Sequence, residues 1–213
     1  MDNYIPSWIA TFQVALRSRE IAFPNHDARR RFVQFFYSHA NRSPDFSQPI
    51  VEKVKDEVFS EEGLSDIESR LRPLTASEKE NFCAPEYQDR VTANSRVQNF
   101  GRYSEDVISR LRKMTVIVAT PSSERKQFIV GSNPVIRFES YKGQELGSPG
   151  VELWTALTPS IAVGFAKPMK RCANVLNLST EQVRLFNTQI AKYSTSIASR
   201  SDVLLESVAN NSW

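Results

Sequence analysis

The stretch VELWTALTPSIAVGFA, residues 151–166, decides the fold of this chain. Large apolar or β-branched side chains occupy every second position of residues 151–157, and again of residues 161–165. Successive side chains of a strand point to opposite faces of a sheet, so this alternation predicts two strands. Pro159 lies between them, where its missing N–H removes no ladder bond, and we predict an antiparallel hairpin that turns there.

Trp154 lies on the opposite face of the first strand from Val151 and Leu153. Such a position predicts either a helix that covers this second face or a partner protein that does so. We favour the helix, because helical patterns flank the strands on both sides in the sequence.

Further apolar runs extend the sheet toward the N-terminus. Residues 115–119, 128–130 and 135–138 are short and rich in β-branched side chains, and GSNP at 131–134 separates the last two. Four of the seven glycines lie between 131 and 150, as loops between strands require. We therefore predict an α+β fold with a mostly antiparallel sheet of four to five strands over about residues 114–166.

Helical patterns precede the sheet. Phe32, Phe35 and Phe36 recur at helical spacing within residues 27–39, with Asn25 or Asp27 as the N-cap. Another helix is predicted to start near Ser104, with Val107, Ile108 and Leu111 on one face. Residues 84–100 have no clear period and are predicted to be irregular.

A long C-terminal helix is predicted from about Ser179, because Ser179 or Thr180 followed by Glu181-Gln182 fits an N-cap with an acid in the first turn. We expect its narrow apolar seam to lie on the sheet or on the helical lobe; the alternative is contact with a protein partner or a second copy of the chain. The seam consists of Val183, Phe186, Ile190, Tyr193 and Ile197. The chain is then one domain, 1–213, made of a mainly helical lobe (1–112), a sheet (113–178) and the C-terminal helix (179–213).

Composition narrows the possible classes of protein. The chain is 40% hydrophobic and 24% charged with a net charge of +3, as in ordinary globular proteins. Cys83 and Cys172 are too few for a disulfide framework or a four-cysteine zinc site, and we expect two reduced thiols. The absence of an 18-residue apolar run, a signal peptide and a glycine-rich phosphate loop predicts a cytoplasmic protein without a membrane span, metal or cofactor.

Four short motifs occur in order over about residues 27–202: HANRSPDF at 39–46, FIVGSNPV at 128–135, GVELWTALTP at 150–159 and VRLFN at 183–187. In this order they resemble a helix end R-[ST]-P, a strand–turn–strand F-I-T-S-D-N-P-V, a strand end P-L-[ST]-P and a last helix V-x-x-L-N. These belong to the family called domain of unknown function 4238. The resemblance implies the α+β architecture and leaves the activity open, because the family has no established one.

The sequence departs from that family at two places. The paired-histidine segment with which the family opens is missing, and Ser132 stands where the family has an aspartate. If those residues form a site in the relatives, this chain lacks most of it.

The candidate catalytic residues are few. His39 lies near Arg42 and Asp45, and the three could form an acid/base group with an anion clamp on one rim. The alternative is structural, because a basic side chain at a helix C-terminus meets free carbonyls there. Glu139, followed by Lys142, comes closest to the acid and lysine of a metal-dependent nuclease.

Two groups of residues are candidates for binding. Ser132 and Asn133 could shape a small polar pocket, or simply build a turn. Lys167, Lys170 and Arg171 follow the last strand and could meet an acidic partner or a phosphate backbone.

Three consecutive arginines, at 29–31, occupy a first helical turn, where positive charge opposes the helix dipole. This unfavourable electrostatic energy suggests a compensating acid such as Asp27, or a bound phosphate. A solvated charged face is the simpler interpretation.

Together these observations lead us to expect a cytosolic, non-enzymatic bacterial module for protein interaction or regulation, for which a mobile-element or defence setting would be consistent. The alternative is a nucleic-acid-acting, metal-dependent hydrolase, intact or degenerate. Its nucleic-acid partner has only weak support from the mild net charge.

Overall fold

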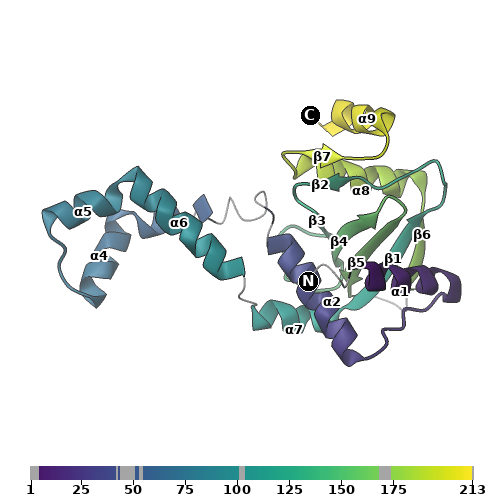
Figure 1. Cartoon of the computed structure of the whole chain (residues 1–213), viewed down its shortest axis with the longest axis horizontal. Coiled ribbons are helices and arrows are strands. Elements are labelled where there is room, and N and C mark those ends of the chain that lie inside the picture. Colours follow the sequence, from purple (N-terminus) through teal and green to yellow (C-terminus); the bar gives the residue numbers. More distant parts are fainter. Residues whose placement is uncertain are drawn as a thin grey trace. The chain divides into compact units, whose positions relative to one another are not determined.

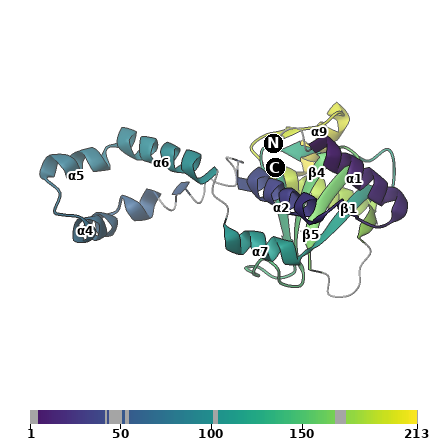
Figure 2. The ribbon, with the colours of Figure 1, turned by 60° about the horizontal axis from the view of Figure 1, so that its bottom comes forward.

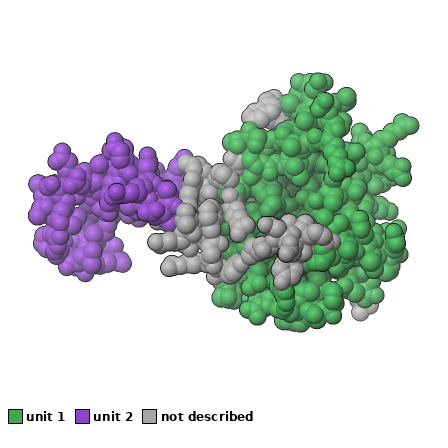
Figure 3. Space-filling model, in the orientation of Figure 1, with its two compact units in different colours: residues 1–45, 104–213 green, residues 46–103 purple. Residues whose placement is uncertain are grey.

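Two compact units make up the chain: a sheet unit of residues 1–45 and 104–213, and a helical unit of residues 46–103 (Figure 3). The helices expected in one lobe over 1–112 are thus divided between both units. The computed structural model describes residues 5–41, 43, 51–52, 55–100, 104–167 and 174–212.

The sheet unit contains a five-stranded sheet with helices on both sides, which confirms the α+β class (Figures 1 and 2). The strand order is β3-β4-β5-β1-β6. Neighbouring strands are antiparallel except β1 and β6, which are parallel, so the sheet is mixed and extends beyond residue 166. The bounds are β1 Thr115–Pro121, β3 Val135–Glu139, β4 Val151–Thr158, β5 Ile161–Ala166 and β6 Val175–Leu178.

The predicted hairpin is confirmed. β4 and β5 pair antiparallel around a turn at Pro159 and Ser160, with Trp154 opposite Gly164. A methyl group on Gly164 would lie 2.5 Å from the indole of Trp154, so the indole lies directly over this glycine. Glycine is required here because a larger residue would occupy the space of the ring.

The predicted helix over the second face of the sheet, on which Trp154 lies, is also confirmed. Trp154 is only 5% exposed and contacts Phe186 of helix α8 (Thr180–Lys192), with ring centroids 6.5 Å apart. Around it, α8 covers a core that includes Ile117, Ile136 and Ile190. Burial of such side chains contributes about 1.5–3 kcal/mol each, so this face provides much of the stability of the unit.

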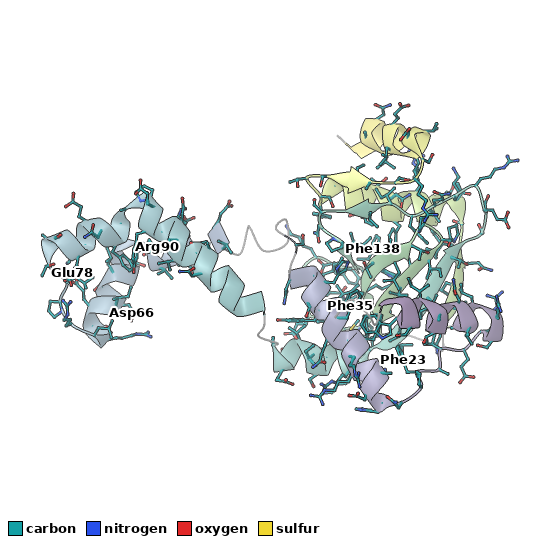
Figure 4. All side chains as sticks on the ribbon, in the orientation of Figure 1. Phe23, Phe35, Asp66, Glu78, Arg90 and Phe138 are labelled. Carbon is teal, nitrogen blue, oxygen red and sulfur yellow. The ribbon has the colours of Figure 1, made fainter. Side chains whose placement is uncertain are left out.

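The opposite face of the sheet packs against helix α2 (His26–Asn41) and helix α1 (Ile5–Ser18) (Figure 2). Phe32 of α2 stacks on Phe165 of β5, and Phe36 meets the same ring edge-on. Phe35, labelled in Figure 4, contacts Trp8 of α1 instead, with ring centroids 4.7 Å apart. The phenylalanine stripe of α2 therefore serves both the sheet and the neighbouring helix.

The prediction of one long C-terminal helix is wrong beyond Lys192. α8 begins where predicted, with a capping box formed by Ser179 and Gln182, and its seam residues Val183, Phe186 and Ile190 are buried on the sheet. The chain then leaves the helix, so Tyr193 is half exposed and Ile197 lies in strand β7 (Ile197–Ala198). A separate helix, α9 (Asp202–Ser212), follows.

The strand predicted over residues 128–130 is mostly absent, because only Val130 belongs to a strand, β2 (Val130–Gly131), which pairs with β7. The backbone just before β2 forms hydrogen bonds with a side chain of α8 and not with another strand. Asn187 of α8 accepts the N–H of Ile129 at 3.1 Å and donates to the carbonyl of Gln127 at 2.9 Å. Apolar side chains therefore enter the core from irregular backbone, which their sequence pattern alone could not reveal.

The helical unit contains α4 (Glu61–Arg70), α5 (Ala76–Cys83) and α6 (Pro85–Phe100). The irregular segment predicted over 84–100 is thus wrong. Proline is favourable in the first turn of a helix, and Pro85 opens α6, but the apolar residues of α6 form no stripe that could signal a helix.

Among its described side chains, the helical unit has none that is buried. Its apolar contacts are partial ones among Phe59, Phe82 and Tyr87, and Arg90 lies over the Tyr87 ring at 5.4 Å. Ion pairs on the surface supplement them, including Arg72–Glu78 at 2.5 Å (Figure 4 labels Asp66, Glu78 and Arg90). Across both units, none of the helices in the described part of the chain is long and apolar enough to span a membrane.

Gly164→Ala should destabilise the protein by about 1–3 kcal/mol, because overpacking a core costs this much. Urea denaturation followed by circular dichroism measures the change. In a Trp154→Leu background the same substitution should cost less, since the clash with the ring is gone and only that with the Leu153 carbonyl oxygen, 2.6 Å from the added methyl group, remains. An equal cost in both backgrounds would contradict the role assigned to the Trp154–Gly164 contact.

Acidification should weaken α5 through Glu78. A hydrogen bond from Arg72, then bonds from the Thr75 N–H and hydroxyl, hold the pKa of Glu78 at about 2, below its usual 4.5. A depressed pKa stabilises the folded state above the unfolded value, so protection of the α5 amides should fall as the pH drops from about 4.5 toward 2. Hydrogen exchange should show this fall in the natural chain and after Glu80→Gln, but a flatter profile after Glu78→Gln.

Candidate anion-binding site

The catalytic candidates at the end of α2 are only partly described. His39 lies in the last turn of α2, half-buried, with its imidazole stacked on Phe35 at 5.3 Å. This stacking gives the imidazole a packing contact in the last turn of the helix. Arg42 and Asp45 lie outside the described residues.

Glu139 holds a loop together. Its carboxylate is 3.3 Å from the Arg137 guanidinium and accepts the N–H groups of Gly143 and Gln144, each at 3.1 Å. The Arg137 guanidinium also donates to the carbonyl of Gln144. These contacts close the turn after β3 and account for Glu139 and Arg137, whereas Lys142, the lysine of the candidate pair, is exposed.

Ser132 and Asn133 form a polar junction with the segment that follows α8. The N–H of Ser132 donates to the carbonyl of Ser196 at 2.9 Å, and the N–H of Ser196 returns a bond to the Ser132 hydroxyl at 3.1 Å. The N–H of Asn133 donates to the Ser194 hydroxyl at 3.1 Å. This turn is therefore built mainly by backbone and hydroxyl groups.

The side-chain oxygen of Asn133 takes no part in this turn. This Oδ1 is buried and accepts no hydrogen bond from the described residues. The junction does reach the end of α2, because the Ser43 hydroxyl donates to the Ser132 carbonyl at 2.6 Å. Ser43, just beyond the end of α2, and the GSNP turn are thus neighbours, whereas Glu139 is engaged in its own loop.

Lys167 is exposed directly after β5, and Lys170 and Arg171 lie outside the described residues. Lys167 follows Ala166, the Cα partner of Thr115 at the start of β1. This basic side chain therefore leaves the sheet at the end where β1 begins.

A pocket of about 550 Å³ lies at this same end of the sheet. Three cationic or basic side chains, His26, Arg29 and Lys113, line it, and no carboxylate of the described residues does. Amides of Asn25 and Asn174 add neutral polar groups, and the rest of the wall is mostly apolar. The excess of positive groups makes this pocket the candidate anion-binding site.

Two of the three consecutive arginines of α2 have different partners. Arg31 pairs with Asp27, and this hydrogen bond is the main reason that the pKa of Asp27 is lowered. The guanidinium of Arg29 instead donates to the carbonyl of Met114 at 2.9 Å, which fixes it in the pocket wall. The compensating acid anticipated for the run serves Arg31, and within the described chain no ion pair neutralises Arg29.

Helix capping explains why the pocket residues stay in place. Asn25 caps α2, since its Oδ1 accepts the N–H of Ala28 at 2.8 Å. Lys113 ends α7 (Glu105–Lys113), whose Ser104 N-cap confirms the predicted start and whose Ile108 and Leu111 are buried. Both helices pack their hydrophobic faces into the core of the sheet unit, which holds their polar ends in place at the pocket.

In chemical terms, the pocket can hold an anion by charge-assisted hydrogen bonds. A guanidinium offers five N–H donors, of which one serves Met114. Arginine binds phosphate and carboxylate groups with paired donors, and a lysine adds a point charge. Among the described residues no cluster of three or more His, Cys, Asp or Glu is arranged to hold a metal ion.

The comparisons with protein-family models, with curated proteins and with solved structures give no match.

Ser194→Ala should destabilise the protein by about 1–3 kcal/mol, because the half-buried N–H of Asn133 loses its acceptor. Thermal unfolding and urea denaturation measure the effect. Ser122→Ala, at an exposed position, is the control and should change the free energy of unfolding by less than about 0.5 kcal/mol. Similar values for the two variants would mean that the junction adds little to stability.

Proposed function

We propose that this protein is a non-enzymatic binding module whose sheet unit takes a phosphate-bearing ligand in the pocket formed by His26, Arg29 and Lys113. The observation that carries the proposal is the concave surface with two permanent cations and no carboxylate on its described wall. Arg29 is half-buried, whereas His26 and Lys113 are exposed. A half-buried cation is costly without an anionic partner, so the Arg29 side of the wall favours an anion as its occupant.

The position of Arg29 strengthens this proposal. A cation in the first turn of a helix opposes the helix dipole. An anion bound there would be attracted both by the dipole and by the cation. Met114 holds the guanidinium through its carbonyl, which leaves the charge without compensation. A phosphate would supply the charge that Arg29 lacks, as Asp27 does for Arg31.

A binding role is favoured over catalysis by the contacts of the two best catalytic candidates. His39 is stacked on an aromatic ring, and Glu139 is used by the loop after β3. The metal-dependent hydrolase is the alternative from the sequence, and no specific contact in the described residues favours it. The cytoplasmic setting, the bacterial origin and kinship with domain of unknown function 4238 are parts of this proposal and rest on sequence patterns alone.

Pyrophosphate is a suitable probe for the pocket, because it carries phosphate charge without a sugar or a base. Isothermal titration calorimetry should detect binding to the natural chain. Arg29→Gln and Lys113→Gln should each weaken it about tenfold or more, since a hydrogen bond to a charged group contributes about 1.5–3 kcal/mol. Circular dichroism must show that both variants are folded.

The matched control is Arg125→Gln with Lys142→Gln, which removes the same two kinds of charge from exposed positions away from the pocket. This double variant should bind pyrophosphate as the natural chain does. Equal loss in the control, or no binding to any of the proteins, would contradict the proposal. Cleavage of labelled RNA or DNA in Mg²⁺ or Mn²⁺, abolished by His39→Ala or Glu139→Ala, would contradict the non-enzymatic role and favour the hydrolase.

A further inference from the structure

The positive charge of this protein is concentrated in the sheet unit. Residues 1–45 and 104–213 contain 19 Lys and Arg against 13 Asp and Glu, whereas residues 46–103 contain 8 against 11. The mild net charge of +3 therefore combines a basic unit of +6 with an acidic unit of −3. Charge asymmetry between two parts of a chain is typical of a part that binds a polyanion.

Within the sheet unit, exposed basic side chains continue outward from the pocket. Arg17 and Arg19 lie at and just beyond the end of α1, immediately before the pocket residues that begin at Ile21. Arg30 is adjacent to Arg29, and Lys167 follows the strand partner of Thr115, which lines the pocket. The positive surface is thus larger than one small anion requires.

Acidic residues offset only part of the positive charge of this surface. The segment from residue 17 to residue 31 contains five arginines and one histidine against Glu20 and Asp27, and Asp27 pairs with Arg31 and is attracted more weakly to Arg30 and His26. Glu20 is exposed at the start of the connection between α1 and α2. A single phosphate in the pocket would leave the outer cations without a role, whereas a chain of phosphates would use them.

We propose that the ligand is a nucleic-acid strand whose terminal phosphate enters the pocket and whose following phosphates lie over Arg17, Arg30 and Lys167. This inference rests on the proposed function, because it names the class of ligand for the same pocket. A terminal phosphate can enter a concave site end-on, while an internal phosphodiester is flanked by sugars on both sides. The apolar part of the pocket wall can accommodate the first sugar or base. The phosphates that follow would use the exposed cations outside the pocket.

Fluorescence anisotropy with labelled 12-nucleotide single strands tests the inference. The strands carry a 5′-phosphate, a 3′-phosphate or no terminal phosphate, and the label is on the other end. At least one terminal phosphate should tighten binding by about tenfold relative to the unphosphorylated strand, which corresponds to one charge-assisted contact. Arg29→Gln with Lys113→Gln should remove this difference.

The outer cations are tested by Arg17→Gln with Arg30→Gln, two exposed side chains that are not part of the pocket wall. This variant should weaken all strands to a similar extent and lower the slope of log affinity against log salt by about 1.4, as expected for two single-strand phosphate contacts. Its binding of pyrophosphate should stay unchanged. The pair Arg125→Gln with Lys142→Gln controls for loss of charge alone.

Three outcomes would overturn the inference. Pyrophosphate binding that persists while strands bind no tighter than pyrophosphate would show a small-anion site and leave the proposed function standing. A phosphopeptide of equal charge that binds as tightly as the phosphorylated strands would indicate a protein ligand. Failure of pyrophosphate and strands alike would overturn both proposals.

Discussion

The indole of Trp154 lying over Gly164 is the contact on which the arrangement of the sheet unit depends. A ring of this size on an inner strand needs a partner strand without side-chain bulk beneath it. On the α8 side β5 accordingly presents only small residues, Ala162, Gly164 and Ala166. On the other side the same strand presents Phe165 to α2. The distribution of bulk along β5 therefore assigns each helix to its face of the sheet.

Polar side chains satisfy the backbone hydrogen-bonding groups that this packing leaves without partners. Segments that enter the core as irregular backbone need donors and acceptors, and residues on or just after α8 provide them: Asn187 for residues 127–129 and Ser194 for the GSNP turn. At the other end of the sheet, Arg29 performs a similar task by bonding the Met114 carbonyl. There the supporting group is a cation, so support of the fold and attraction of an anion coincide in one side chain.

Part of this site could be predicted from sequence. Arginines in a first helical turn are an electrostatic anomaly that is visible in the residue order, and it pointed to an acid or a phosphate. The rest of the site could not be predicted, because Lys113 and Asn174 line the pocket but lie 84 and 145 residues after Arg29 in the sequence. Glu139 illustrates the converse: in the sequence a carboxylate near a base is a catalytic candidate, and the loop contacts that it makes are visible only in the structure.

By itself the sequence determined the local features: the hairpin with its turn at Pro159, the two-sided burial around Trp154, and the N-caps of α2, α7 and α8 to within two residues. These depend on periodicity and on side chains that bond their nearest neighbours, so they can be read from adjacent residues. Only the tertiary structure decided the parallel pairing of β6 and the end of α8 at Lys192. It also decided the helical state of α6 and the pocket itself. Each of these depends on segments that are distant in the chain, or on a helix without a buried stripe, and neither leaves a local pattern.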